Sequence, residues 1–441
     1  MRPQMAGGTI MRRVIVAVLL GLLGGSAELS GAVSQSEEFQ LLERMLKEDI
    51  VPFWYPGLAD RESGGFRLNH GKDGKWKGPA PKGIVSQARM VWFLARLSRS
   101  PYGNPEHLAA AMHGFEFLRL SLWDQEFGGF YWTVSHDGKA PIQAAKHLYG
   151  QAFGLYALSE LAAASGEEAP LRLAKELFAL LEEHAHDDRW GGYLEFFERD
   201  WSEPSAGTVG YMGVESNIKL MNTHLHLMEA VTTFYRVSKD PVAGDRLVEL
   251  MNIQSNSVVR KSIGACTDKY TLDWNPLSGK KFSVVSYGHD IENAWLLMDA
   301  SDALGTPRQP FLDLYRTMFD YSLSYGFDHQ KGGFFYTGPF NGKAVDLNKH
   351  WWVQAEGLIS ALMLFQMTGE VRYWEVFRKT LSWIDQYQTD REGGGWYGVV
   401  LPDGRAQGDK ANIWKTPYHN GRAVLECLRI LRTGLARDQV E

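Results

Sequence analysis

The sequence predicts an all-α protein, an (α/α)6 barrel in which twelve helices form six hairpin repeats. A Gly-Gly-aromatic turn recurs five times, at Gly64-Gly65-Phe66, Gly128-Gly129-Phe130, Gly191-Gly192-Tyr193, Gly332-Gly333-Phe334 and Gly394-Gly395-Trp396. The first glycines are 64, 63, 141 and 62 residues apart. Because one gap is about twice the others, a sixth, degenerate copy is expected near Ile263-Gly264. Six such units can bury their apolar faces against one another and close into a ring.

Two apolar segments with helical periodicity belong to each repeat, one before and one after the turn. The first helices are predicted near residues 37–51, 105–121, 168–184, 241–258, 309–326 and 370–388. The second are predicted near 83–99, 144–165, 217–237, 285–303, 350–368 and 416–432. The second set is poorer in charge and richer in Ala, Gly, Trp and His, so we expect it to form the inner ring. The glycines are expected to adopt positive φ, and the aromatic side chains to plug the barrel end.

Composition indicates one large domain, residues 33–441. A length of 441 residues would allow two or three domains, but the repeat runs through nearly the whole chain without a Pro/Ser-rich linker. Fifteen tryptophans exceed what a core of this size requires. Some are expected to line a sugar-stacking cleft, although filling a wide barrel explains any single one equally well.

The N-terminus predicts a signal peptide, residues 1–32, and an exported protein. Arg12 and Arg13 precede a short apolar run, 14–23, and Ala32 ends a segment of small residues. The run is short for a membrane span. Without residues 1–32 the net charge changes from -6 to -8, and the chain has no Lys/Arg run, so nucleic acid and anionic membranes are excluded as partners. A monomer that binds a small molecule is expected. A disulfide between Cys266 and Cys427 is neither predicted nor excluded.

Three histidines fall in the early turns of three different predicted inner helices: His226, His289 and His419. If the repeats place these helices parallel, the three side chains converge at one end of the barrel. Asn222 and His226 share a helical face, whereas His224 points about 160° away from His226. A lone histidine on an apolar face is more often structural, but three at one level favour function. We therefore expect His226 in the site and His224 in a structural role.

Other inner helices add polar and aromatic groups at the same level: Arg89, Lys146, His147, Tyr149, Trp351, Trp352, Gln354 and Glu356. Glu292 shares a face with His289. A buried Arg or Glu without a partner is costly, so each is expected to face a water-filled, ligand-sized cavity. The chain has no His-Glu-x-x-His motif and no paired cysteine ligands, so no metal is expected.

These residues are compatible with more than one chemistry. A pair of histidines suits proton transfer at a carbon acid, because one ring can accept a proton on one face while the other donates on the opposite face. Hydrolysis of a glycosidic bond by inversion needs two carboxylates, which Glu292 and Glu356 could supply. A sugar-binding protein without turnover is the third possibility. Because this barrel hosts both isomerases and hydrolases, the residues alone leave the choice open.

Several of these segments resemble motifs of the N-acylglucosamine 2-epimerase superfamily, and within it the cellobiose 2-epimerases. They are residues 146–151, 221–226, 286–292, 351–356 and 414–420. The resemblance extends over residues 41–431. It implies a cofactor-free enzyme that opens the reducing-end sugar of a β-1,4-linked disaccharide and inverts carbon 2 through a cis-enediolate. Mannobiose and monosaccharides, such as N-acylglucosamine or mannose, remain alternative substrates.

The resemblance also implies roles for individual residues. His289 and His419 are implied to be the acid/base pair on opposite faces of carbon 2. His226 is implied to hydrogen-bond the sugar oxygens and the enediolate, and Glu292 to orient His289. The residues implied to bind the sugar are Arg89, Tyr149, Asn222, Glu292, Trp351, Trp352, Glu356 and Trp414.

Overall fold

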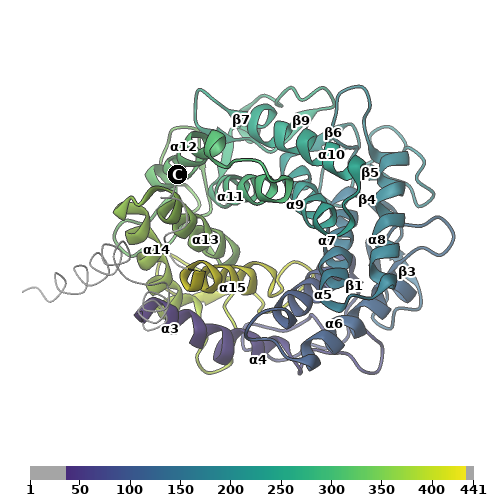
Figure 1. Cartoon of the computed structure of the whole chain (residues 1–441), viewed down its shortest axis with the longest axis horizontal. Coiled ribbons are helices and arrows are strands. Elements are labelled where there is room, and N and C mark those ends of the chain that lie inside the picture. The colour runs from purple at the N-terminus through teal and green to yellow at the C-terminus, as the bar shows by residue number, and fades with distance from the viewer. Residues whose placement is uncertain (1–35, 434–441) are drawn as a thin grey trace, which may run out of the picture.

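Two concentric rings of helices form the molecule, and the computed structural model describes residues 36–433 of the chain (Figure 1). The inner ring consists of α5 (Ile84–Ser98), α7 (Leu148–Ser165), α9 (Met221–Ser238), α11 (Tyr287–Leu304), α13 (Trp351–Thr368) and α15 (Tyr418–Thr433). The outer ring consists of α3 (Glu37–Arg44) with α4 (Val51–Trp54), α6 (Pro105–Phe117), α8 (Glu168–Leu180), α10 (Pro241–Asn252), α12 (Leu312–Gly326) and α14 (Val371–Trp383). The predicted (α/α)6 barrel of six hairpins is confirmed.

Five outer helices widen into π-helix where they approach the Gly-Gly turns. Each passes into a π-helical segment: Met45–Ile50, Leu118–Leu122, Leu181–Ala185, Ile253–Ser257 and Ile384–Gln388. The sixth, α12, instead begins after the 3-10 turn Gln309–Phe311, and another such turn spans Lys280–Phe282. The helix predicted at 241–258 therefore consists of an α-helix followed by a π-helical segment, and its overall extent is close to the one predicted.

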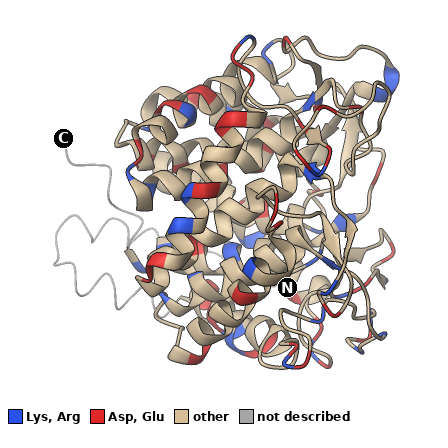
Figure 2. Ribbon diagram, turned by 90° about the vertical axis from the view of Figure 1, so that its right-hand side faces the viewer, with Lys and Arg blue, Asp and Glu red and all other residues tan. Residues whose placement is uncertain are grey.

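Short strands precede five of the inner helices: β1 (Lys82–Gly83), β4 (Lys146–His147), β6 (Ile218–Leu220), β10 (Val284–Ser286) and β12 (Lys349–His350). They pair antiparallel with β2 (Thr133–Val134), β5 (Phe196–Phe197), β9 (Lys269–Thr271), β11 (Thr337–Pro339) and β13 (Val399–Val400), respectively. The other strands are β3 (Pro141–Gln143), β7 (Val259–Arg260), β8 (Ala265–Cys266) and β14 (Ala406–Gln407). In the side view of Figure 2 the strands and long loops gather at the right-hand end of the barrel. Because of these strands, α7 and α9 each begin four residues later than predicted.

All ten glycines of the five repeated turns have positive φ, between 65° and 85°, as predicted. The aromatic residue that follows each pair is fully buried. In the first repeat, Gln87 of α5 accepts from the Phe66 N–H at 2.8 Å and donates to the Phe66 carbonyl at 2.9 Å. Gln151 and Gln354 bind Phe130 and Phe334 in the same way. These three turns are thus bound to the helix of the inner ring that follows each of them.

The degenerate copy expected near Ile263-Gly264 is present in the fourth repeat. Gly264 has φ 86°, and its N–H donates to the Arg260 carbonyl as the first glycine does in four of the regular turns. Cys266 takes the place of the aromatic residue, and Asp290 of α11 accepts from its N–H at 3.0 Å. The backbone contact therefore survives although both side chains have changed.

A buried Asp–Lys ion pair accompanies the five regular turns. The pairs are Asp60–Lys82, Asp124–Lys146, Asp187–Lys219, Asp328–Lys349 and Asp390–Lys410, of which the first four measure 2.7 to 2.9 Å. In the degenerate repeat, Arg260 and Val285 occupy the corresponding places. Because an unpaired buried charge destabilises the fold, replacing both the Asp and the Lys costs less stability than replacing one of them.

Three further features expected from the sequence concern the two cysteines, membrane-spanning segments and the N-terminus. Cys266 and Cys427 are both free and buried, so they form no disulfide with each other. Among residues 36–433, no helix combines the length and apolarity needed to cross a bilayer. The predicted signal peptide, residues 1–32, lies outside the described residues.

Candidate active site

The three candidate histidines lie in the first two turns of inner helices, at the barrel end where the short strands precede them. His419 is the second residue of α15, His289 the third of α11 and His226 the sixth of α9. The prediction of early helical turns is confirmed, but the positions are not equivalent, because His226 lies about one turn deeper. Since strands and loops set where each helix begins, sequence spacing alone could not give this offset.

One tryptophan contacts two of the histidines. The ring centroid of Trp352 is 4.7 Å from that of His289 and 5.7 Å from that of His419. Trp351 lies 6.4 Å from His419 on the same helix, α13. Aromatic packing at these distances fixes the orientation of the imidazoles without using their nitrogens.

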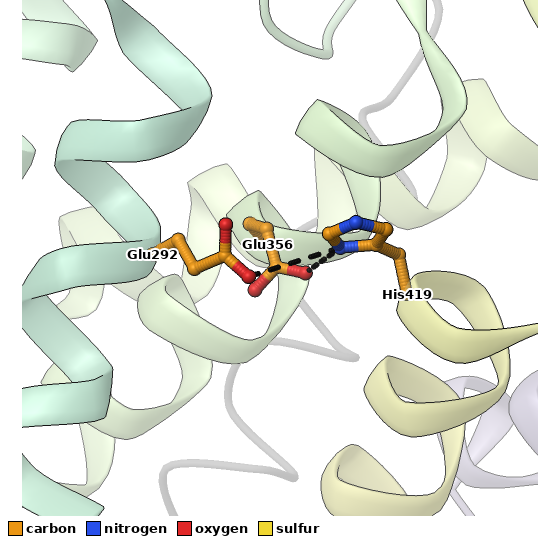
Figure 3. Close-up of side chains that lie close together, drawn as sticks. All are labelled: Glu292, Glu356 and His419. Atoms are coloured by element: carbon orange, nitrogen blue, oxygen red, sulfur yellow. Dashed lines mark hydrogen bonds and ion pairs between the residues drawn. The ribbon is translucent and has the colours of Figure 1, made fainter. Parts of the chain in front are cut away.

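His419 is held by a carboxylate from the neighbouring helix. Its Nδ1 lies 2.7 Å from Glu356 Oε1 and 3.9 Å from Glu292 Oε1 (Figure 3). A carboxylate that accepts at Nδ1 keeps the ring proton there and leaves Nε2 free to accept another. Burial, reinforced by the Arg89 and Arg422 guanidiniums, holds the pKa of His419 well below its usual range. The ring is therefore neutral near pH 7, with an unprotonated Nε2.

His226 is held in the same manner from its own helix. Its Nδ1 is 3.1 Å from Glu229 Oε2, and its ring packs 5.3 Å from Tyr149 and 4.9 Å from Phe153. Burial would raise the pKa of Glu229, but Arg422 overcomes this and lowers it to about 2. Burial lowers the pKa of His226 to about 4.

His289 is half-buried, and no hydrogen bond to its ring is present among the described residues. Burial lowers its pKa to about 4, and Glu356 opposes the shift. The ring is therefore a neutral imidazole near pH 7 whose nitrogens are available to a ligand.

Arg422 is the centre of a charge network that sequence analysis missed. Its Nη2 donates to Glu292 Oε1 at 2.7 Å and to Glu356 Oε1 at 2.8 Å, and its Nη1 donates to Glu229 and, at 2.6 Å, to the Tyr418 hydroxyl. Trp295 Nε1 donates to the other oxygen of Glu356 at 2.8 Å. All these side chains are buried.

The network corrects what was expected of Glu292 and Glu356. Both are fully buried and ion-paired, so they contact Arg422 rather than a water-filled cavity, and one guanidinium meets the cost of burying them. Glu292 contacts His419 and not His289, whose orientation it was expected to set. Burial and the neighbouring Glu356 charge raise the pKa of Glu292 well above its usual range, and the Arg422 guanidinium opposes this shift.

A spacing of three residues could have revealed the network. His226 is followed by Glu229, His289 by Glu292 and His419 by Arg422, and residues three apart lie on one helical face. Each charged group therefore lies about one turn below its histidine. Glu229 and Glu292 carry the opposite charge to Arg422 at matching positions of different helices, and this was the signal that they form ion pairs.

The remaining predicted sugar-binding residues surround the histidines. Arg89 donates to the Tyr149 hydroxyl at 3.1 Å and to the Trp414 carbonyl at 2.9 Å. Trp414 is 37% exposed. Asn222 Oδ1 is buried without a hydrogen-bond partner among the described residues, which is expected of an atom that a ligand would satisfy.

Three other polar residues are structural. Lys146 belongs to β4 and not to an inner helix, and its ammonium is paired with Asp124 rather than facing a cavity. His147 accepts from the Tyr149 N–H at 3.2 Å at the start of α7. His224 accepts from the Tyr193 N–H at 3.0 Å and lies 2.8 Å from the Leu220 carbonyl, so the structural role predicted for it is confirmed.

One group of side chains has the ligand types of a metal site. Glu292, Glu356 and His419 each offer an atom within 4.8 Å of the others. Arg422 already binds the Oε1 atoms of both carboxylates. A cation there would have to displace or oppose the guanidinium charge.

Comparison with known proteins defines the class of this barrel as the carbohydrate epimerases and isomerases. The sequence profile of N-acylglucosamine 2-epimerase (GlcNAc 2-epimerase) matches residues 64–423, and the chain belongs to this family. A cellobiose 2-epimerase of Bacteroides fragilis is 31% identical over 396 residues, which are 88% of this chain and 98% of the relative. The structure of a cellobiose 2-epimerase from Bacillus thermoamylovorans aligns with a TM-score of 0.82 and 30% identity, covering 89% of this chain and 98% of its own. A D-mannose isomerase of Marinomonas mediterranea is 27% identical over 87% of this chain and 95% of its own.

Proposed function

We propose that this carbohydrate epimerase inverts carbon 2 of the reducing-end sugar of a β-1,4-linked disaccharide such as cellobiose. The observation that carries the proposal is the pair of neutral imidazoles, His289 and His419, packed against the same indole of Trp352. Similarity to cellobiose 2-epimerases over almost the whole length of both chains supports the substrate class.

In the proposed reaction, the sugar opens and one imidazole removes the proton on carbon 2. A general base works best when it is unprotonated at the working pH, and burial provides this for both rings. The other imidazole takes up a proton from solvent and delivers it to carbon 2 on the opposite face, while the first ring releases the abstracted proton to solvent. The two rings exchange roles in the reverse direction. Glu356 positions His419 through Nδ1, so that Nε2 takes part in the transfer.

The enediolate between the two transfers carries negative charge on the sugar oxygens. The guanidinium of Arg89 is the donor proposed to stabilise it, since donors placed where charge develops accelerate such steps. The unprotonated Nε2 of His226 is proposed to accept from a hydroxyl of the sugar. The Arg89 guanidinium is oriented by Tyr149 and the Trp414 carbonyl and lies over the Phe153 ring at 4.1 Å.

Inverting hydrolysis is disfavoured by the geometry of the two carboxylates. Inverting glycosidases place these groups about 6.5–9.5 Å apart on either side of the bond, with room for a water. Glu292 and Glu356 instead offer atoms within 4.8 Å of each other, and the same Arg422 nitrogen binds both. Neither side chain is exposed.

Incubation with cellobiose in heavy water tests the proposal. We expect the carbon-2 epimer, with deuterium at carbon 2, because the abstracted proton exchanges on the imidazole. Free monosaccharide without the epimer would indicate a hydrolase, and binding without exchange would indicate a sugar-binding protein. Mannobiose and mannose are assayed in parallel. Conversion of mannose alone would make the substrate a monosaccharide, as the name of the D-mannose isomerase relative gives for that protein.

A further inference from the structure

A cavity lies in the barrel, and none of the three histidines lines it. Its volume is about 390 Å³, and its lining comes from the middle and C-terminal parts of all six inner helices. The floor includes Trp92, Tyr156 and Trp295, and the first two rings are stacked with centroids 5.0 Å apart. The candidate active site uses the N-terminal turns of the same helices, so the two sites face opposite ends of the ring and adjoin at Arg422 and Trp295.

Arginines outnumber carboxylates in the lining of this cavity. Six arginines line it: Arg96, Arg99, Arg236, Arg308, Arg422 and Arg429. The carboxylates in the lining are four, Glu160, Asp299, Asp302 and Glu426. Five of the arginines share these four carboxylates, and the ion pairs of Arg422 are with glutamates on the catalytic side. Part of this charge offsets the negative ends of the helix dipoles, but it also leaves the cavity attractive to an anion.

Two buried donors of the lining have no acceptor among the described residues. They are Arg422 Nε and Trp92 Nε1, on side chains that are 2% and 3% exposed. Buried N–H groups without a partner are rare, because each forfeits the energy of a hydrogen bond. Both groups can only donate, so the partner that satisfies them must be an acceptor.

We propose that this cavity binds a small oxyanion, a phosphate or sulfate group, either free or carried by an organic molecule. Guanidinium groups suit such a ligand because their paired N–H donors match the spacing of its oxygens. Arg236 and Arg99 are two partly exposed arginines of the lining, with 36% and 42% of their side chains exposed, and a bound anion would share them with Asp299 and Glu160.

The cavity shares two residues with the catalytic network. Trp295 lines it and donates to Glu356, which holds His419, while Arg422 lines it and donates to the same Glu356. An anion bound beside Arg422 would weaken the attraction between its guanidinium and the carboxylates of Glu229, Glu292 and Glu356. Occupancy is therefore expected to change kcat, whereas binding itself requires no sugar and no turnover.

Isothermal titration calorimetry of the full chain, in a chloride buffer without sugar, tests the site. We expect inorganic phosphate and sulfate to bind with one site per chain. Replacing both Arg99→Gln and Arg236→Gln removes two charged donors and should weaken binding by roughly tenfold or more. The control Arg405→Gln changes an arginine that is 77% exposed, is paired with Asp403 and does not line the cavity, and it should bind as the unmodified protein does.

Titration with glucose 6-phosphate distinguishes the two sources of the anion. Tighter binding than inorganic phosphate indicates a phosphorylated metabolite, and equal or weaker binding indicates the free ion. If the double variant does not fold, the unmodified protein still decides: millimolar phosphate must raise its Tm. Absence of binding, or equal affinity in the folded double variant, would overturn the proposal. His289→Asn should leave phosphate affinity unchanged, so a failure here is distinct from failure of the proposed epimerase reaction.

Discussion

His289 and His419 differ from the buried His224 in what holds their rings. The ring of His224 is bonded to backbone groups at both nitrogens, whereas His419 is bonded at Nδ1 alone and His289 contacts Trp352. A ring with a free nitrogen can transfer protons. Residue type and spacing do not reveal this difference, since it depends on which groups other helices bring to each ring.

Replacing His289 or His419 by Asn should lower kcat by about 100- to 10,000-fold or more, because each variant loses a general acid/base. Sugar affinity should largely persist. Steady-state kinetics together with calorimetric sugar binding measures both effects. A variant that retains most of its kcat would remove that histidine from the proton-transfer pair.

Replacing Arg422 by Met should destabilise the protein by about 3–5 kcal/mol, because Glu229, Glu292 and Glu356 lose their common partner while remaining buried. Thermal and urea unfolding measure the change. Arg405→Gln, at an exposed pair, serves as the control and should shift stability by less than about 1 kcal/mol. Comparable shifts in the two variants would mean that the network contributes little.

Exhaustive chelation should leave activity intact. Arg422 supplies positive charge to the carboxylates of the one group with metal-ligand types found among residues 36–433. The assay compares kcat before and after dialysis against EDTA. Loss of activity that zinc or manganese restores would instead make Glu292, Glu356 and His419 ligands.

At the scale of elements, the fourth residue of an inner helix binds the preceding Gly-Gly-aromatic turn. Gln87, Gln151 and Gln354 make this contact in three of the repeats. His224 makes it with the Gly191-Gly192-Tyr193 turn, and Asp290 makes it with the degenerate turn. The contact, rather than the residue type, is what the repeats share. His224 is thus the counterpart of a structural glutamine, in agreement with its helical phase.

His224→Gln should therefore preserve both the fold and kcat, because glutamine makes this contact in three other repeats. His224→Ala should lower Tm, since the buried Tyr193 N–H would lose its acceptor at a cost of about 1–3 kcal/mol. Melting curves and kinetics of both variants decide the matter. A large loss of turnover in a stable His224→Gln protein would place this histidine in the chemistry.

At the scale of the whole molecule, buried neutral histidines link stability to pH. Burial lowers the pKa of His226 and His289 to about 4, and that of His147 and His224 to about 3. Histidines in the unfolded chain have pKa values near 6.5. Between about pH 4 and pH 6.5 the unfolded chain therefore binds more protons than the folded chain. Stability should therefore fall as pH decreases from about 6.5 toward 4, and remain flat with respect to these groups above about 7.

Urea unfolding at several pH values tests this linkage. Activity should show a matching acid limb below about pH 5, because a protonated imidazole cannot accept the carbon-2 proton. Measuring kcat only where the protein remains folded separates the two effects. Stability that rises as pH falls from 6.5 to 5 would contradict the neutral assignment.

The sequence by itself determined the ring. Turns at a period near 63 residues and helical apolar patterns are local features, so they predict twelve helices and their inner or outer place before any contact is known. The family motifs likewise predict the histidines. What only the tertiary structure decided is which buried charges meet: Arg422 is 193 residues from Glu229 and 66 from Glu356, yet binds both. Such pairing depends on the rotation and depth of each helix in the closed ring, which short strands and loops set and which no local pattern encodes.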